Sequence, residues 1–432
     1  MGNDVLLVGN TGHSGDPGKG DGACIARTSR FQQALLNADF SIDVCTPGSE
    51  RSGISHIRQR ISENNFRCIV SISPHPAESA VLSGTSLPHW IDMNGMHPAE
   101  INLTSDKPGL PRLEMLRILA LENLLLRRGD RFSAPSSRQT HAILGELFLL
   151  GRLDYRSRYN VPVHPIPHCA MPATLSETDR TPGSPFNIIS TGAFNSWFDP
   201  ETLFKGIEYA MMKSSEIFFT ATGGLLPYAA EKYESFLKLV SASRFRDRFS
   251  LMGWVTEEEL QKIQHSASAA VYTDVSGGET ILGARTRAVD WINRGIPVVC
   301  TSGAEISEDI HRYGMGIVIP QNDWQALGEA FLLLASDNDF CAGIRKAQAA
   351  WRERAGDINT VFKPLIEWCA EPTALETVPL GKPTVSTVSS FSYRTAVFRE
   401  IARKTNFFLA SSFVLKSMLI RGRSGKSLKA DQ

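Results

Sequence analysis

Residues 270–305, AVYTDVSGGETILGARTRAVDWINRGIPVVCTSGAE, contain the clearest structural signal in the chain. They begin with an apolar run typical of a buried parallel strand. A loop with two adjacent glycines follows, and then a helix predicted over about 284–293. Gly295 is placed to end that helix, and a second apolar strand is predicted over 296–300. Strand, glycine loop, helix and strand make a βαβ unit, and such units bind ligands at the loop.

The residues of this loop favour an anionic ligand. Gly277 and Gly278 would let the backbone approach a phosphate closely, and the amides of a helix N-terminus would point at it. Arg285 and Arg287 can add bidentate contacts to a diphosphate. The alternative is that both arginines lie on a solvated helix face, paired with surface acids.

The same segment resembles the donor-binding region of GT-B glycosyltransferases, in particular the nucleotide-sugar-dependent family 4. That family has two acids separated by seven residues, and then a G-x-P-V-V strand. Residues 295–299, GIPVV, match the strand, and Asp290 lies where the second acid is expected. Glu279 would be the first acid, but ten residues separate it from Asp290, and Asp replaces Glu at the second position.

Composition indicates a globular protein of two ordinary domains. The chain has 432 residues, 42% of them hydrophobic and 21% charged, and a formal net charge of zero, so nothing suggests a nucleic-acid partner. Its seven cysteines form no CxxC pair and no metal spacing, which favours reduced thiols in a cytoplasmic protein. The N-terminus lacks a signal-type apolar core, and no apolar run approaches the length of a membrane span.

The N-terminal region predicts a strand over 4–9, a glycine-rich loop over 11–22 and a helix over about 25–37. The loop is neither a P-loop nor a clean GxGxxG motif. In GT-B enzymes the matching loop faces the cleft between the domains. The resemblance therefore places Gly15, Gly18 and Gly20 on the acceptor side, whereas the glycines alone are equally consistent with a flexible surface loop.

Two further strands, predicted over 66–73 and 87–95, end in polar residues. Ligands bind at the carboxyl ends of parallel strands, so His75, Asp92 and Asn94 become candidates for the acceptor side of the cleft. We expect neither a metal site nor a cofactor. The motifs WIDMNG, GDRFS, LGEL and GRLD resemble a bacterial subgroup of these transferases that acts in polysaccharide assembly.

The second half predicts alternating strands and helices, including strands over 186–191, 217–222 and 249–252 and helices over 200–212 and 256–266. In family 4 the first loop of this domain lies near the donor phosphates, and the turn matching Gly253-Trp254-Val255 lies near the base. The resemblance thus implies a set of donor-binding residues, which are Gly192, Asn195, Gly223, Gly224, Trp254, Gly277, Gly278, Thr280 and Asp290. The residues expected to be catalytic are Glu279, Arg285, Arg287 and Asp92.

The expected architecture is α/β of the GT-B type, with two Rossmann-like domains facing each other across a cleft. Pro/Ser/Thr-rich stretches suggest linkers, and the family's last helix, here about 360–369, usually returns across the cleft. The predicted parts are an acceptor-side domain 1–170, a linker 171–185, a nucleotide-sugar-binding domain 186–370, a linker 371–391 and a basic amphipathic helix in 392–432.

The C-terminal region is strongly basic. Residues 391–432 contain nine Lys or Arg and two Asp or Glu, a net charge of +7. An amphipathic helix of this kind can lie on an anionic inner-membrane surface, which would make the protein peripheral there. The alternative is that its apolar stripe packs on the N-terminal domain.

The resemblance implies a glycosyltransferase that moves a sugar from a nucleotide diphosphate sugar to a hydroxyl of a glycan or lipid-linked acceptor. It would retain the anomeric configuration and need no metal. Two alternatives stay open. One is a nucleotide-sugar epimerase on the same fold. The other is a non-catalytic partner, suggested by the altered acid spacing and by a first loop of the second domain, around Gly192, that lacks arginine.

Overall fold

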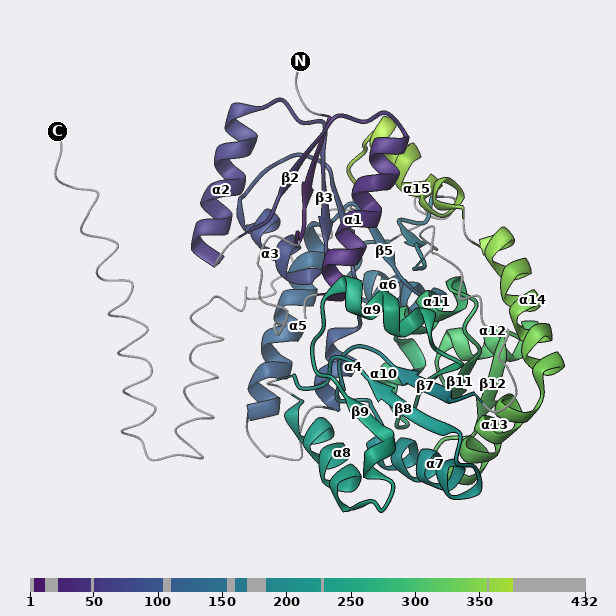
Figure 1. Cartoon of the computed structure of the whole chain (residues 1–432). Helices are drawn as coiled ribbons and strands as arrows, with labels where there is room; N and C mark the ends of the chain where they lie inside the picture. The colour runs from purple at the N-terminus through teal and green to yellow at the C-terminus, as the bar shows by residue number, and fades with distance from the viewer. Residues whose placement is uncertain are drawn as a thin grey trace, which may run out of the picture.

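The computed structural model contains two parallel β-sheets, each of six strands and each flanked by helices (Figure 1). The α/β class predicted from the alternating strands and helices is therefore confirmed. The structure describes residues 4–11, 22–47, 50–103, 110–153, 160–168, 184–226, 229–355 and 357–375. We refer to the part up to 168 as the first half and to the part from 184 as the second half.

The first sheet has the strand order β2-β1-β3-β4-β5-β6. Its strands are β1 (Val5–Val8), β2 (Ile42–Cys45), β3 (Cys68–Ile72), β4 (His89–Asp92), β5 (Arg131–Ala134) and β6 (Val163–Pro165). Every pair is parallel, with Val5 opposite Cys68 and Ile72 opposite Asp92. The central strands are buried on both faces, which explains why they consist of continuous apolar runs.

Six helices connect these strands. They are α1 (Gly22–Asn37), α2 (Glu50–Glu63), α3 (Pro74–Leu82), α4 (His97–Asn102), α5 (Leu110–Arg128) and α6 (Ser137–Leu149). No helix was predicted at α3, which directly follows the strand predicted over 66–73. Proline is well suited to a first helical turn, where its missing N–H is no loss, and α3 begins at that residue.

The second sheet has the order β12-β11-β10-β7-β8-β9, again with all strands parallel. Its strands are β7 (Phe186–Ser190), β8 (Ile217–Ala221), β9 (Phe249–Leu251), β10 (Ala269–Tyr272), β11 (Val298–Thr301) and β12 (Gly316–Ile319). Its helices are α7 (Pro200–Lys213), α8 (Ala230–Ala242), α9 (Glu257–His265), α10 (Gly278–Leu282), α11 (Thr286–Asn293), α12 (Glu305–Tyr313), α13 (Trp324–Ser336) and α14 (Asn338–Ala355).

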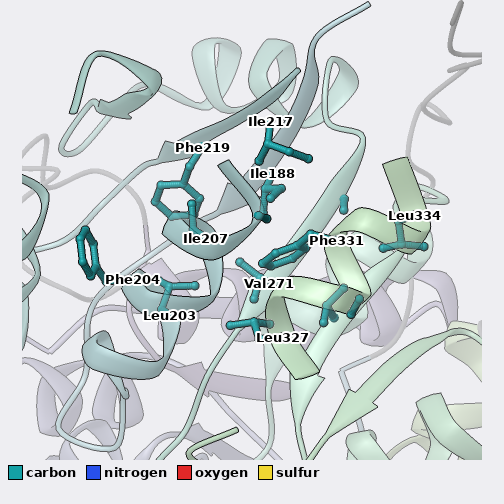
Figure 2. Close-up of a cluster of buried hydrophobic side chains, with 14 of the residues drawn as sticks. Ile188, Leu203, Phe204, Ile207, Ile217, Phe219, Val271, Leu327, Phe331 and Leu334 are labelled. Carbon is teal, nitrogen blue, oxygen red and sulfur yellow. The ribbon is translucent and has the colours of Figure 1, made fainter. Parts of the chain in front are cut away.

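One apolar core of the second half lies between its sheet and the helix pair α7 and α13, and a separate buried cluster includes residues of α11 and α12. Figure 2 shows side chains from α7 and α13 meeting those of the strands, among them Leu203, Phe219, Val271 and Phe331. All four are completely buried. This apolar layer fixes the sheet against its helices and so positions the loops at the carboxyl ends of the strands.

The helix after the double glycine is divided into two. The sequence predicts a single helix that starts at about residue 284. In the structure, a short α10 ends at Leu282, before that point, and α11 begins at Thr286. Gly283 permits this break, because a Cβ there would lie 2.2 Å from a carboxylate oxygen of Glu279. The predicted end of the helix is confirmed, since Gly295 follows α11 with a φ of 74°.

The last described helix, α15 (Ile358–Ala370), packs on the first sheet and beside α1 (Figure 1). The rings of Phe362 and Phe31 meet edge to face, with 4.8 Å between their centroids, and the ring centroids of Trp368 and Trp90 are 5.7 Å apart. The predicted return of this segment to the first half is therefore confirmed, and the chain crosses between the two sheets a second time.

Candidate functional site

The two halves meet at the loop between β10 and α10, which contacts α4. A Cβ at Gly277 would lie 3.1 Å from a methyl carbon of Leu103, and one at Gly278 would lie 3.8 Å from the Cβ of Ala99. The double glycine thus allows close packing between the halves, in addition to the anion binding predicted for it.

Three glycines at the ends of β7 and β8 form a close backbone crossing. Gly192, Gly223 and Gly224 have φ values of 88°, 78° and 120°, which side chains rarely adopt. A Cβ at Gly223 would lie 2.5 Å from the carbonyl oxygen of Gly192. Gly223 also donates its amide to the carbonyl of Gly253, at 2.6 Å, which ties this crossing to the turn that carries the half-buried Trp254.

Arg287, on the first turn of α11, reaches toward the Gly192 loop. Its Nη2 donates to the carbonyl of Ala193 at 2.7 Å and would lie 3.5 Å from a Cβ at Gly192. Its Nη1 is buried and has no hydrogen-bond acceptor among the described residues. Burial lowers the pKa of Arg287 to about 10, so the side chain is still a cation at neutral pH. A buried guanidinium nitrogen without an acceptor is costly, and an anionic ligand would satisfy it.

Arg285 is placed differently from Arg287, because two acids already surround it. Its Nε donates to Asp274 at 2.6 Å, and Nη1 and Nη2 donate to the two oxygens of Glu279 at 2.9 and 2.8 Å. All three side chains are buried. Burial alone would lower the pKa of Arg285, but the two carboxylates outweigh it and the pKa is raised. Arg285 therefore organises the loop and holds Glu279 in place.

Glu279 has both carboxylate oxygens on Arg285, and burial raises its pKa although Arg285 opposes the change. Thr280 donates its hydroxyl to the carbonyl of Val275 at 2.6 Å, which closes the loop on itself. Asp290 lies on α11 and accepts from Gln264 of α9 at 2.7 Å, with Arg294 also nearby at 3.4 Å. The structure thus brings Glu279 and Arg285 together and places Asp290 against α9.

Asn195 lies in the loop after β7, where its carbonyl accepts from the amide of Phe198 at 3.0 Å. This loop also carries Gly192 and Ala193, so Asn195 is close in sequence to the Arg287 contact. Its side chain is half-buried.

Asp92 ends β4 as predicted but is completely buried. Its two oxygens accept from Nε and Nη2 of Arg27, both at 2.6 Å, and one also accepts from Ser133 at 2.6 Å. These bonds join α1, β4 and β5. The carboxylate of Asp92 thus accepts its hydrogen bonds from Arg27 and Ser133. The sequence did not predict Arg27 as its partner.

His75 and Asn94 lie at the same edge of the first sheet. His75 is exposed and its ring lies 5.8 Å from that of His97. Asn94 donates to the sulfur of Cys24 at 3.9 Å, and Ser73 donates to the same sulfur at 3.4 Å. Ser73 has a φ of 71°, unusual for a residue other than glycine. Strained backbone often occurs at functional sites, and residue type alone does not reveal it.

A second contact between the halves was also missed. The carboxylate of Glu305 accepts from the backbone amides of Ser137 and Arg138, at 3.0 and 2.8 Å, at the first turn of α6. Arg138 in turn donates to the carbonyls of Ile281 and Gly303, at 3.1 and 2.6 Å. A carboxylate at a helix N-terminus is favourable for the same reason that a phosphate is.

Several predictions lie outside the described residues. They concern Gly15, Gly18 and Gly20, most of both linkers, and the basic amphipathic helix in 392–432. Among the helices that the structure describes, none is long and apolar enough to cross a membrane. Within the same residues, no group of three His, Cys, Asp or Glu side chains is arranged to hold a metal ion.

The fold is similar to those of several solved structures. The chain resembles Anabaena HepE in complex with UDP and glucose, with a TM-score of 0.59 and 14% identity over 86% of this chain and 100% of HepE. It resembles the sucrose-phosphate synthase of Thermosynechococcus elongatus with a TM-score of 0.60 and 14% identity, over 84% and 98% of the two chains.

An E. coli trehalose-6-phosphate protein bound with UDP-2-fluoro glucose is similar with a TM-score of 0.58 and 10% identity, over 86% and 99% of the two chains. No protein-family model and no curated protein sequence matches the chain. At these identities the likeness establishes the architecture. The two parallel sheets and their helices have the GT-B fold that the sequence predicted.

Proposed function

We propose that this protein is a glycosyltransferase that uses a nucleotide diphosphate sugar as donor. The observation that carries the proposal is the buried Nη1 of Arg287, which lacks an acceptor among the described residues beside the glycine crossing at Gly192 and Gly223. A diphosphate there would accept from Arg287, and the glycines leave room for it to come close to the backbone. The solved structures of similar fold include complexes with UDP, UDP with glucose, and UDP-2-fluoro glucose.

In the proposed reaction, an acceptor hydroxyl oxygen forms a bond to the anomeric carbon of the donor sugar. The bond from that carbon to the diphosphate oxygen breaks, and the hydroxyl proton passes to the leaving diphosphate. Attack from the same face retains the anomeric configuration. Arg287 would stabilise the charge that develops on the diphosphate, and because this cation is fixed in advance, the step costs little reorganisation and requires no metal.

The other predicted residues take supporting roles in this proposal. Glu279 would accept from hydroxyls of the donor, and Arg285 would hold Glu279 in the required orientation. Trp254 would lie near the base. Residues 186–370, apart from α15, which packs on the first sheet, would act as the donor-binding domain and 1–170 as the acceptor-side domain, as in glycosyltransferase family 4 and its polysaccharide-assembly subgroup. A glycan or lipid-linked acceptor fits that assignment.

Incubation with a panel of nucleotide sugars tests the proposal. Donor consumption that depends on an added acceptor supports the transferase. Conversion of the donor to an isomeric nucleotide sugar without acceptor would instead identify an epimerase, and binding without turnover would identify a non-catalytic partner. Thermal shifts with nucleoside diphosphates narrow the panel, because a ligand that binds the native state raises its stability.

We also propose that residues 392–432 hold the protein on an anionic membrane surface at the cytoplasmic side. The support is the net charge of +7 over 391–432. Sedimentation of the full chain with vesicles tests this: binding to anionic vesicles that is lost at high salt is expected, and equal recovery with neutral vesicles would contradict it.

A further inference from the structure

Glu100 lies at the contact between the two halves. It is part of α4, and Ala99 of this helix and Leu103, which follows it, pack on the double glycine of the second half. Ser196, in the loop after β7, donates its hydroxyl to the backbone oxygen of Glu100 at 3.5 Å. One face of α4 therefore packs on the loops that we propose to bind the donor, and Glu100 lies next to that face.

The carboxyl of Glu100 extends over the turn that follows β4. Its Oε1 would lie 2.6 Å from a Cβ at Gly95, which has a φ of 106°. Glycine is thus needed at position 95 both for its conformation and for the space it leaves. The side chain is half-buried, and no described residue donates a hydrogen bond to its carboxyl. A carboxyl held in a fixed place and without a donor is suited to a ligand that supplies one.

The charged groups around Glu100 restrict what that ligand can be. Glu279 and Arg285 act on it from the second half. On α5, burial, Glu146 and Glu100 together raise the pKa of Glu122, and a buried carboxyl oxygen of Glu122 has no partner among the described residues. The cation that acts on Glu100, Arg285, is already engaged with Asp274 and Glu279. It is therefore not available to an anion, whereas the carboxyl of Glu100 can form a hydrogen bond with an uncharged hydroxyl.

We propose that Glu100 is a substrate-positioning residue of the transfer site, whose carboxyl binds a hydroxyl of a sugar lying between α4 and the Glu279–Arg285 pair. This inference rests on the proposed function and extends it, because it assigns a specific group of the first half to the site. Glu100 then takes the place that Asp92 was expected to fill. Asp92 has its hydrogen-bond donors in Arg27 and Ser133, whereas no described residue donates to the carboxyl of Glu100.

The protonation of Glu100 is consistent with this role. Burial raises its pKa to about 7, the nearby Glu279 adds to the effect, and Arg285 opposes it. Burial and the neighbouring acids raise the pKa of Glu122 to about 8, and burial lowers that of His97, on the same helix, to about 4. Near neutral pH the carboxyl of Glu100 is therefore partly protonated and can both donate to and accept from a hydroxyl. Above pH 7 it loses its proton and becomes an acceptor only.

The test compares Glu100→Ala and Glu100→Gln with the wild-type full chain, and uses Glu367→Gln on an exposed part of α15 as the matched control. Steady-state rates are measured from pH 6 to 9, and nucleoside diphosphate binding is measured separately by calorimetry. We expect Glu100→Ala to lower kcat/KM by about tenfold or more, the usual effect of losing a hydrogen bond to a substrate, and to leave diphosphate affinity within about twofold.

Glu100→Gln should retain most activity, since an amide also donates and accepts, and its rate should no longer change with pH near 7. Wild-type rates in Glu100→Ala would overturn the proposal while leaving the transferase intact, and so would an equal loss of diphosphate binding. A wild-type chain that neither transfers a sugar nor binds a nucleoside diphosphate would overturn the proposed function, and this inference with it.

Discussion

Arg285 and Glu279 are joined by two parallel hydrogen bonds, of 2.9 and 2.8 Å, inside the loop that follows the double glycine. Asp274 binds the remaining edge of the same guanidinium at 2.6 Å. Arg285 and Glu279 were both expected to contact the donor directly. Their mutual pairing means that a substitution at either one changes the shape of the loop as well as its charge.

Substitution of Glu279 should therefore affect stability and activity together. Glu279→Ala leaves Arg285 with one of its two acids, and removal of one partner from a buried ion pair typically costs about 3 kcal/mol of unfolding free energy. Turnover should fall by more than about 10²-fold. Urea unfolding and initial rates measure the two effects. A variant with normal stability and normal rates would remove both roles from Glu279.

Substitution of Arg287 should affect ligand binding more than stability. Its Nη1 has no acceptor among the described residues, so Arg287→Ala removes a cation with one buried, unsatisfied nitrogen. We expect nucleoside diphosphate affinity to fall by about 10- to 100-fold, with an unfolding midpoint that is unchanged or higher. Isothermal titration with the free nucleotide measures the affinity. The exposed Arg246→Ala is the control and should bind as the wild type does.

Gly223 should tolerate no side chain. In Gly223→Ala the new methyl would meet the carbonyl oxygen of Gly192 at 2.5 Å, on a backbone with a φ of 78°. The two effects together should cost at least about 1–2 kcal/mol and displace the Gly192 loop. Loss of nucleotide binding with a lower melting temperature is the expected result. The matched control is Gly145→Ala in α6, where a methyl meets nothing within 4 Å and a helix gains from the change.

The contact of Glu305 with α6 should hold the two halves together. Glu305→Ala removes the acceptor for the amides of Ser137 and Arg138, whereas Glu308→Ala removes an exposed partner of Arg138 alone. Exposed pairs contribute little, so only the first variant should open the molecule. Small-angle scattering should show a larger radius of gyration for Glu305→Ala than for Glu308→Ala. Identical curves would mean that other contacts are sufficient.

The buried His89 predicts a loss of stability in acid. Burial lowers its pKa to about 3, with Arg128 adding to the effect, and its ring is hydrogen-bonded to Ser71 at 2.7 Å. The unfolded chain binds a proton below about pH 6.5 and the folded chain does not, so stability falls as the pH drops below that value. Between pH 7.5 and 5 this one group should cost about 2 kcal/mol.

Chemical unfolding of His89→Gln at the two pH values checks this expectation, because the variant has no group to titrate at that position. The difference in unfolding free energy between pH 7.5 and 5 should be smaller in His89→Gln than in the wild type. His56→Gln, at an exposed position, should keep the wild-type difference. If the two variants respond alike, His89 does not control the acid sensitivity.

The sequence by itself determined the α/β class, most of the buried strands and the position of the glycine turns, but it did not predict β12. Continuous apolar runs such as those of β3 and β10 can only be buried on both faces, and that condition already implies parallel strands covered by helices. Gly295 at the end of α11 follows from the same local rules. These features depend on neighbouring residues, so the sequence contains the information needed to predict them.

Only the tertiary structure decided which charged groups are available to a ligand. Asp92 is occupied by Arg27, 65 residues away, and Arg285 is occupied by Asp274 and Glu279, whereas Arg287 retains a free buried nitrogen among the described residues. The pairing of a charge depends on which segments the fold brings within about 3 Å, and no local pattern specifies that distance. The position of Glu100 over Gly95 and beside the second half likewise depends on which segments the fold brings together.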